Sequence, residues 1–162
     1  MSAVDILARA RAKGIMIVTA ESCTGGLIAG AITDIPGSSD VLDRGFVTYS
    51  NAAKTEMLGV PKDLIAAHGA VSEPVAFAMA EGALDRSGAG LALSVTGVAG
   101  PGASEQKPEG MVCFGVARTG EKTHTETVHF GALGRDGVRR ASVDHGLALL
   151  LKALTDTQDL QP

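Results

Sequence analysis

Two candidate nucleophiles, Ser22 and Cys23, stand side by side in the stretch AESCTGG. Apolar runs over residues 15–18 and 27–32 flank this stretch, a pattern that predicts a buried strand, a turn and a helix. Ligands of α/β proteins collect at the carboxyl ends of strands, where a hydroxyl or thiol can attack a bound carbonyl group if a base lies beside it. The simpler interpretation is that Ser22 or Thr24 only caps the helix, which is the commoner role for a single turn of this kind.

A base could come from Lys54, which follows Tyr49 at a second strand-to-helix junction. Residues 45–50, GFVTYS, are rich in β-branched and aromatic types and predict a strand. The helix predicted over residues 51–58 carries Lys54 near its start, where the positive end of the helix dipole disfavours the charge of a lysine. This position suits a base, although a half-buried tyrosine and a solvated lysine are the simpler explanation of this junction taken alone.

A glycine-rich loop follows the strand predicted over residues 91–96, at a third junction of the same kind. Its sequence, TGVAGPG, lets a ligand approach main-chain N–H groups closely because glycine has no side chain. The loop has neither the Gly-Lys-Ser/Thr of a Walker motif nor the spacing of a dinucleotide fingerprint. The positions that we expect to face a ligand are Thr96, Gly97, Gly100 and Gly102.

Three arginines, Arg135, Arg139 and Arg140, gather at the start of the last predicted helix. The chain has a formal net charge of −4, and this cluster is its most concentrated positive patch. Arginine binds phosphate bidentately, and the amino terminus of a helix favours anions, so the cluster could hold a phosphorylated small molecule. A solvated basic face explains the cluster equally well.

Helix and strand patterns alternate along most of the chain, and a hairpin pattern comes late. Helices are predicted over residues 3–13, 24–34, 51–58, a short segment before His68, 73–86 and 139–154, and strands over 15–19, 45–50, 91–96, 111–118 and 122–130. This order predicts an α/β fold with helices on both faces of a mixed, mainly parallel sheet that ends in a β-hairpin. We expect one domain over residues 1–156 and a frayed tail over 157–162.

The composition excludes several classes of protein. With 45% hydrophobic and 20% charged residues the chain is typical of a soluble globular protein, and its acidic balance argues against a nucleic-acid partner. Two cysteines without metal or disulfide spacing favour a reduced, cytoplasmic setting, and four scattered histidines form no metal motif. No apolar run approaches the roughly 20 residues that span a membrane, and the amino terminus lacks the pattern of a signal peptide. We therefore expect no metal, no cofactor and no membrane partner.

Four segments, taken in order, resemble one family. AESCTGG, GFVTYSNAAKTEMLGV, HGAVSEPVAFAMAEGA and SVTGVAGPGA with KPEGMV are similar to the C-terminal domain of CinA proteins, over about residues 3–154. The resemblance implies a three-layer α/β/α sandwich and an amidohydrolase that converts nicotinamide mononucleotide into nicotinic acid mononucleotide and ammonia. It matches the family's catalytic residues to Ser22, Tyr49 and Lys54. It also implies the stand-alone form, without the metal-dependent pyrophosphatase domain of larger CinA proteins.

Two small departures from the family pattern fall in the glycine-rich loop. Val98 stands where the family usually has isoleucine, a harmless change beside a glycine loop. Ala103 stands where the family has a third glycine, which would alter the loop if that position requires a positive φ.

The residues and the resemblance together predict a mechanism. Ser22 attacks the carboxamide, Lys54 takes its proton, and Tyr49 relays the proton and orients Lys54. The backbone N–H groups expected to stabilise the oxyanion are those of Cys23, Thr24 and Gly25. One or more of the three arginines would hold the phosphate of the substrate.

Two alternatives stay open at this point. Cys23 could be the nucleophile of the same enzyme, or the chain could be a non-catalytic module that binds a nucleotide or a protein partner. The Ala- and Leu-rich first and last helices also permit a homodimer or a higher homo-oligomer.

Overall fold

A five-stranded mixed sheet forms the centre of the molecule in the computed structural model, which describes residues 2–155. The strand order is β2-β1-β3-β4-β5. The strands are β1 (Ile17–Glu21), β2 (Leu42–Val47), β3 (Leu91–Gly97), β4 (Met111–Arg118) and β5 (His124–His129). β1 pairs in parallel with both β2 and β3, whereas β4 pairs antiparallel with β3 and β5. The predicted sheet and late hairpin are confirmed, and the tail predicted over 157–162 lies outside the described residues.

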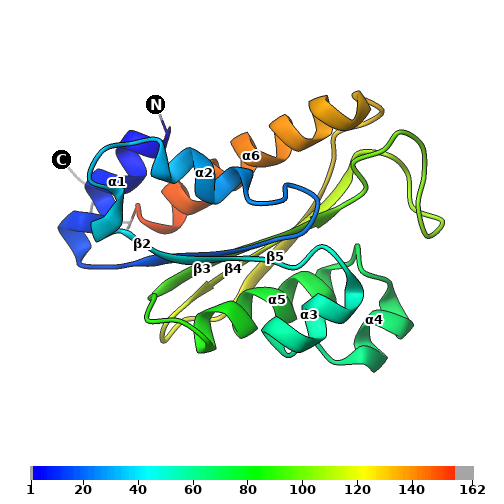
Figure 1. The fold of residues 1–162 in the computed structure, drawn as a ribbon, viewed down its shortest axis with the longest axis horizontal. Coiled ribbons are helices and arrows are strands. Elements are labelled where there is room, and N and C mark those ends of the chain that lie inside the picture. The colour runs from blue at the N-terminus through cyan, green and yellow to red at the C-terminus, as the bar shows by residue number, and fades with distance from the viewer. Residues whose placement is uncertain (1, 156–162) are drawn as a thin grey trace.

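Helices cover both faces of this sheet, so the predicted three-layer α/β/α architecture is confirmed (Figure 1). One layer holds α1 (Ser2–Lys13), α2 (Leu27–Thr33) and α6 (Gly134–Ala153), and the other holds α3 (Asn51–Leu58), α4 (Lys62–His68) and α5 (Glu73–Asp85). A 3₁₀ turn, Ser38–Asp40, leads into β2. Within residues 2–155, no helix is both long and apolar enough to cross a membrane.

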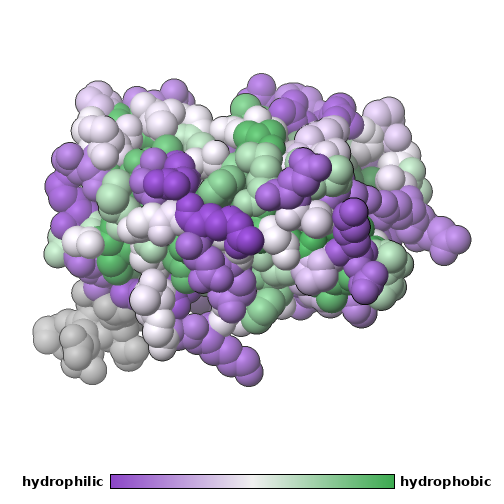
Figure 2. All heavy atoms as spheres, turned by 60° about the horizontal axis from the view of Figure 1, so that its bottom comes forward, coloured by the Kyte–Doolittle hydropathy of each residue, from purple (hydrophilic) through white to green (hydrophobic). Residues whose placement is uncertain are grey.

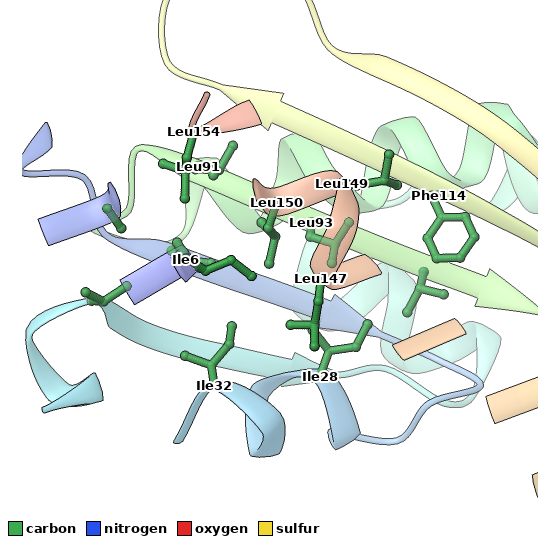
Figure 3. Close-up of a cluster of buried hydrophobic side chains, with 14 of the residues drawn as sticks. Ile6, Ile28, Ile32, Leu91, Leu93, Phe114, Leu147, Leu149, Leu150 and Leu154 are labelled. Atoms are coloured by element: carbon green, nitrogen blue, oxygen red, sulfur yellow. The ribbon is translucent and has the colours of Figure 1, made fainter. Parts of the chain in front are cut away.

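The two larger hydrophobic clusters of the described residues lie one on each face of the sheet and hold the layers together. Successive side chains of a strand point to opposite faces, so Ile17 joins the cluster under α1, α2 and α6, while Val18 joins the cluster under α5. In the first cluster Leu93 of the sheet lies against Ile28 and Leu147 from the helical layer (Figure 3). This double burial explains why the central strands appear in the sequence as continuous apolar runs. The outer surface on the side of α3, α4 and α5 is mainly hydrophilic, with separate apolar patches (Figure 2).

Several element boundaries differ from the sequence prediction, among them the starts of β1, β2 and α6. β1 begins at Ile17 rather than at residue 15, and β2 begins at Leu42 rather than at residue 45, because their mutual pairing starts at these two residues. α6 begins at Gly134 rather than at residue 139. The carboxylate of Glu109 accepts a hydrogen bond of 2.8 Å from the Gly134 N–H, so a side chain outside the helix satisfies its first donor.

Candidate active site

The carboxyl ends of the three parallel strands meet at one edge of the sheet. Glu21, the last residue of β1, pairs with Val47 of β2 and with Val95 of β3, so the segments that follow these strands converge. They enclose a pocket of about 290 Å³, close to the lower limit for small-molecule sites. The residues that were predicted for the site and line this pocket are Ser22, Cys23, Tyr49, Lys54, Thr96, Gly97, Gly100, Gly102 and Arg135.

A buried Ser–Lys pair forms the floor of the pocket. The Nζ of Lys54 donates a hydrogen bond of 3.0 Å to the Oγ of Ser22, and it also donates to the carbonyl oxygens of Thr48 at 3.0 Å and Tyr49 at 3.2 Å. The Lys54 side chain is only 1% exposed, and this burial lowers its pKa. The two carbonyl oxygens can only accept hydrogen bonds, so each takes one of the two N–H groups of a neutral Lys54 amine. The lone pair of this amine is then free to accept a hydrogen bond from the Ser22 hydroxyl.

Helix α3 brings Lys54 to this position. The Oγ of Ser50 caps the helix by accepting a hydrogen bond of 3.0 Å from the Ala53 N–H. Lys54 follows one turn into the helix, where its own N–H bonds to the Ser50 carbonyl at 3.2 Å. The prediction that Lys54 lies near a helix start is confirmed.

The neighbouring thiol has a different environment. Cys23 is 5% exposed and belongs to the hydrophobic cluster under α1, α2 and α6. Burial raises the pKa of its thiol to about 12. A thiol with this pKa stays protonated near neutral pH, whereas the thiolate is the reactive form. Ser22, with Lys54 beside it, is therefore the better-equipped nucleophile of the two.

Glu21 shapes the turn that carries Ser22, a role that the sequence interpretation missed. Its buried carboxylate accepts hydrogen bonds from the Thr24 hydroxyl at 2.5 Å, the Ile28 N–H at 2.9 Å and the Ala29 N–H at 3.0 Å. The first N–H groups of α2 are thus capped by Glu21, so neither Ser22 nor Thr24 is the helix cap that the simpler interpretation required. A glutamate at the end of a strand, shortly before a helix start, was the available signal.

The turn also corrects two expectations about backbone donors. Gly25 and Gly26 have φ values of 60° and 104°, which delay the start of α2 to Leu27. The Gly25 N–H donates to the Ser22 carbonyl at 3.1 Å, so it is used within the turn rather than offered to an oxyanion. Thr24 and Gly25 lie outside the lining of the pocket as the described residues form it.

Tyr49 follows β2 and contributes to the site in an unexpected way. Its backbone carbonyl holds Lys54, but its side chain is 60% exposed. The Tyr49 hydroxyl accepts a hydrogen bond of 2.6 Å from the Nη2 of Arg135. In this structure the phenol therefore contacts the arginine at the pocket mouth, and it is the main chain that orients Lys54.

The three arginines of α6 have three different environments. Arg135 lines the pocket and donates through Nη1 to the Gly100 carbonyl at 2.7 Å. Arg139 lies outside the pocket lining and donates through Nε to the Cys23 carbonyl at 3.1 Å, which anchors α6 to the Ser22 turn. Arg140 is exposed and paired with Asp136 at 2.9 Å. Only Arg135 of the three predicted phosphate ligands is thus brought into the pocket.

The glycine-rich loop forms the opposite wall. The Thr96 hydroxyl donates to the Ala70 carbonyl at 2.9 Å, so it ties β3 to the segment before α5. The Gly102 N–H donates to a carboxylate oxygen of Glu109 at 2.7 Å. Ala103 is not among the residues of positive φ, so its replacement of a glycine introduces no backbone strain.

Among the lining residues that the sequence interpretation missed are Asn51 and Glu105, whose side chains carry polar or charged groups. Asn51 is the first residue of α3, next to the cap at Ser50. Glu105 accepts a hydrogen bond of 3.2 Å from the Ala70 N–H, and its φ of 50° places it in the left-handed region. Its charge opposes the lowering of the Lys54 pKa, because a nearby anion favours the ammonium form. Among the described residues, no cluster of histidine, cysteine or acidic side chains could hold a metal ion.

The fold and the pocket define a class: a three-layer α/β domain in which a buried Ser–Lys pair and an arginine line the same pocket. The chain belongs to the CinA C-terminal domain family, whose sequence model matches residues 2–154.

Comparisons with individual proteins agree with this assignment. A CinA-like protein of Mycobacterium sp. (strain MCS) is 51% identical over 156 residues, which is 96% of this chain and 37% of that protein. This chain spans only 30% to 37% of the length of three curated relatives that it matches. Solved structures cover it almost entirely. The competence/damage inducible protein CihA of Agrobacterium tumefaciens is 47% identical with a TM-score of 0.91, over 96% of this chain and 94% of that one. The competence damage-inducible protein A of Klebsiella pneumoniae is 34% identical with a TM-score of 0.92, over 96% of each chain.

Proposed function

We propose that this chain is an amidohydrolase that converts nicotinamide mononucleotide into nicotinic acid mononucleotide and ammonia. The observation that carries the proposal is the contact of 3.0 Å between Lys54 Nζ and Ser22 Oγ at the floor of the pocket. A hydroxyl beside a buried amine with a lowered pKa is a nucleophile with its own base. The identity of the substrate comes from the resemblance to the CinA C-terminal domain family, and Arg135 at the pocket mouth suits the phosphate of this substrate.

The first half of the reaction forms an acyl-enzyme. Neutral Lys54 takes the proton of the Ser22 hydroxyl as Oγ attacks the carboxamide carbon. The tetrahedral intermediate collapses when the carbon–nitrogen bond breaks, and Lys54 returns the proton to the departing nitrogen, which leaves as ammonia. Water then attacks the Ser22 ester while Lys54 takes a proton from it, the bond between the acyl carbon and Oγ breaks, and Lys54 returns the proton to Oγ as the carboxylic acid product leaves and ionises.

Backbone N–H groups at the ends of β3 and β1 are our candidates for the oxyanion donors. The Val98 N–H donates to the Met111 carbonyl of β4 at 2.9 Å. Successive N–H groups along a strand point to opposite sides, so the Gly97 N–H points away from β4, toward the end of β1 where Ser22 lies. We assign the oxyanion to the Gly97 N–H, with the Cys23 N–H as the second donor.

The charges of the pocket suit the two ends of the proposed substrate. Arg135 offers the free N–H groups of its guanidinium to the phosphate at the mouth. The nicotinamide ring carries a positive charge, and Glu105, which acts electrostatically on Lys54, places a carboxylate near the reacting end. The pocket therefore matches a molecule with an anion at one end and a cationic aromatic amide at the other.

An ammonia-release assay on nicotinamide mononucleotide tests this proposal. We expect purified protein to release one ammonia for each nicotinic acid mononucleotide formed, and to do so in the presence of EDTA because every group in the proposed chemistry belongs to the protein, the substrate or water. Ser22→Ala should abolish release while still binding the nucleotide.

Two results would contradict the proposal in different ways. Binding of the nucleotide without ammonia release by the wild-type protein would identify a non-catalytic binding module. Loss of activity with EDTA would show that a metal takes part in the chemistry.

A further inference from the structure

Glu109 joins two segments that meet at the mouth of the pocket. One oxygen of its carboxylate accepts a hydrogen bond of 2.7 Å from the Gly102 N–H in the glycine-rich loop. The other oxygen accepts one of 2.8 Å from the Gly134 N–H, the first residue of α6. The two segments are far apart in the sequence, and the Glu109 side chain bonds to both of them.

The arginine that we assign to the phosphate, Arg135, also connects these two segments. Arg135 directly follows Gly134, and its guanidinium donates to the Gly100 carbonyl in the same loop at 2.7 Å. Arg135 and Glu109 thus form two separate connections between the loop and α6. Gly100 also packs closely against the Glu109 side chain, because a Cβ added at Gly100 would lie 2.5 Å from the Glu109 carboxyl carbon.

We propose that Glu109 is a positioning residue that sets the place of the Arg135 guanidinium and so determines the affinity for the phosphate group of the substrate. This inference rests on the proposed function for the identity of the substrate. The carboxylate occupies the first free N–H of α6, the position where a helix would otherwise bind an anion itself. The Arg135 guanidinium therefore binds the phosphate in place of the helix N–H groups. The two hydrogen bonds of Glu109 hold the loop and the start of α6 together, and this sets the direction of the remaining N–H groups of Arg135.

A comparison of two ligands in one variant tests the inference. Glu109→Gln keeps the size of the side chain, but its amide can accept from only one of the two N–H groups and turns a donor toward the other. In a Ser22→Ala background, calorimetry would measure the binding of nicotinamide mononucleotide and of nicotinamide riboside, which lacks the phosphate. We expect Glu109→Gln to weaken binding of the mononucleotide about tenfold, the equivalent of one lost charge-assisted contact, and that of the riboside less than about twofold.

The ratio of the two affinities does not depend on the fraction of protein that is folded. A matched control is Glu73→Gln, because Glu73 also joins two donors, the hydroxyls of Thr125 at 2.9 Å and Thr127 at 2.7 Å, away from the pocket. Glu73→Gln should leave the ratio unchanged.

Two outcomes overturn the inference: equal weakening of both ligands by Glu109→Gln, or wild-type-like binding of the mononucleotide. Failure of the proposed function is recognised separately, because it would appear as no ammonia release by protein with an intact Ser22, whatever the affinity ratio shows.

Discussion

The two ends of the pocket are built in opposite ways. At the floor, Ser22 and Lys54 are 8% and 1% exposed, and Lys54 makes three hydrogen bonds to groups at the ends of buried strands and the segments beside them. At the mouth, Arg135 and Tyr49 are exposed and bonded to each other, and they are held by a loop and by the start of a helix.

This difference indicates a division of work. A group that must lose a proton needs burial and fixed partners, because both lower the pKa of an amine and direct its lone pair. A group that must capture a hydrated phosphate from solution needs access and free N–H groups, and an exposed arginine provides them. Changes at the floor should therefore lower kcat, while changes at the mouth should raise KM.

The largest expected effect is at Ser22. Ser22→Ala removes the nucleophile, and we expect ammonia release to fall at least about 10³-fold. Ser22 is the hydroxyl of the described pocket lining that lies within 3.0 Å of the Lys54 amine, the proposed base. The measurement is the steady-state rate with nicotinamide mononucleotide, and Ser142→Ala, which alters a buried serine of α6, is the control. Activity that survives Ser22→Ala and disappears in Cys23→Ala would assign the reaction to the thiol.

Lys54 should show almost as large an effect, together with a change in pH dependence. Lys54→Met removes the base, and we expect kcat to fall about 10²- to 10⁴-fold. In the wild type only the neutral amine is active, so kcat/KM should rise with pH through the pKa of Lys54, and burial places that midpoint below the usual value of about 10.4. A pH profile in which this rising limb persists unchanged in Lys54→Met would show that another group is the base.

Arg135 should act mainly on KM. Arg135→Ala removes the guanidinium from the mouth, and we expect KM for nicotinamide mononucleotide to rise about tenfold to 100-fold with little change in kcat. Arg140→Ala, at an exposed arginine paired with Asp136, is the matched control and should leave both constants unchanged. If Arg140→Ala raises KM as much as Arg135→Ala does, the phosphate lies on the outer face of α6 instead.

The sequence predicted the floor of this site better than its mouth. Ser22 and Lys54 were found because each lies at a junction between a strand and a helix, and parallel strands bring such junctions to one edge. The carbonyl oxygens of Thr48 and Tyr49 were not predictable, since main-chain acceptors carry no residue signature.

The arginines could not be separated from one another for a related reason. Arg135 and Arg139 are one helical turn apart, so which of them enters the pocket depends on where α6 begins. The prediction of a start at residue 139 placed Arg135 outside the helix, whereas the contact between Gly134 and Glu109 starts α6 at Gly134. A long-range contact between a loop residue and the first residue of α6 therefore decided what periodicity alone could not.

The smallest expected effect on activity is at Cys23, and it tests whether this buried neighbour of Ser22 serves the core of the protein rather than the reaction. Cys23→Ala should change kcat less than about threefold, because the thiol is protonated and packed in the core, but it should cost about 1 kcal/mol of stability near neutral pH.

Burial raises the pKa of Cys23 from 9.0 to about 12, so between these values the unfolded thiol ionises while the folded one does not. The free energy of unfolding should thus fall with rising pH above about pH 9, by up to roughly 1.4 kcal/mol per pH unit for this thiol. Cys113, whose pKa burial also raises, adds to the same loss. Urea unfolding from pH 8 to 11 should show a shallower decline in Cys23→Ala than in the wild type; an unchanged decline, or rapid alkylation of Cys23 by iodoacetamide at pH 7, would place the thiol in a more open environment than the core.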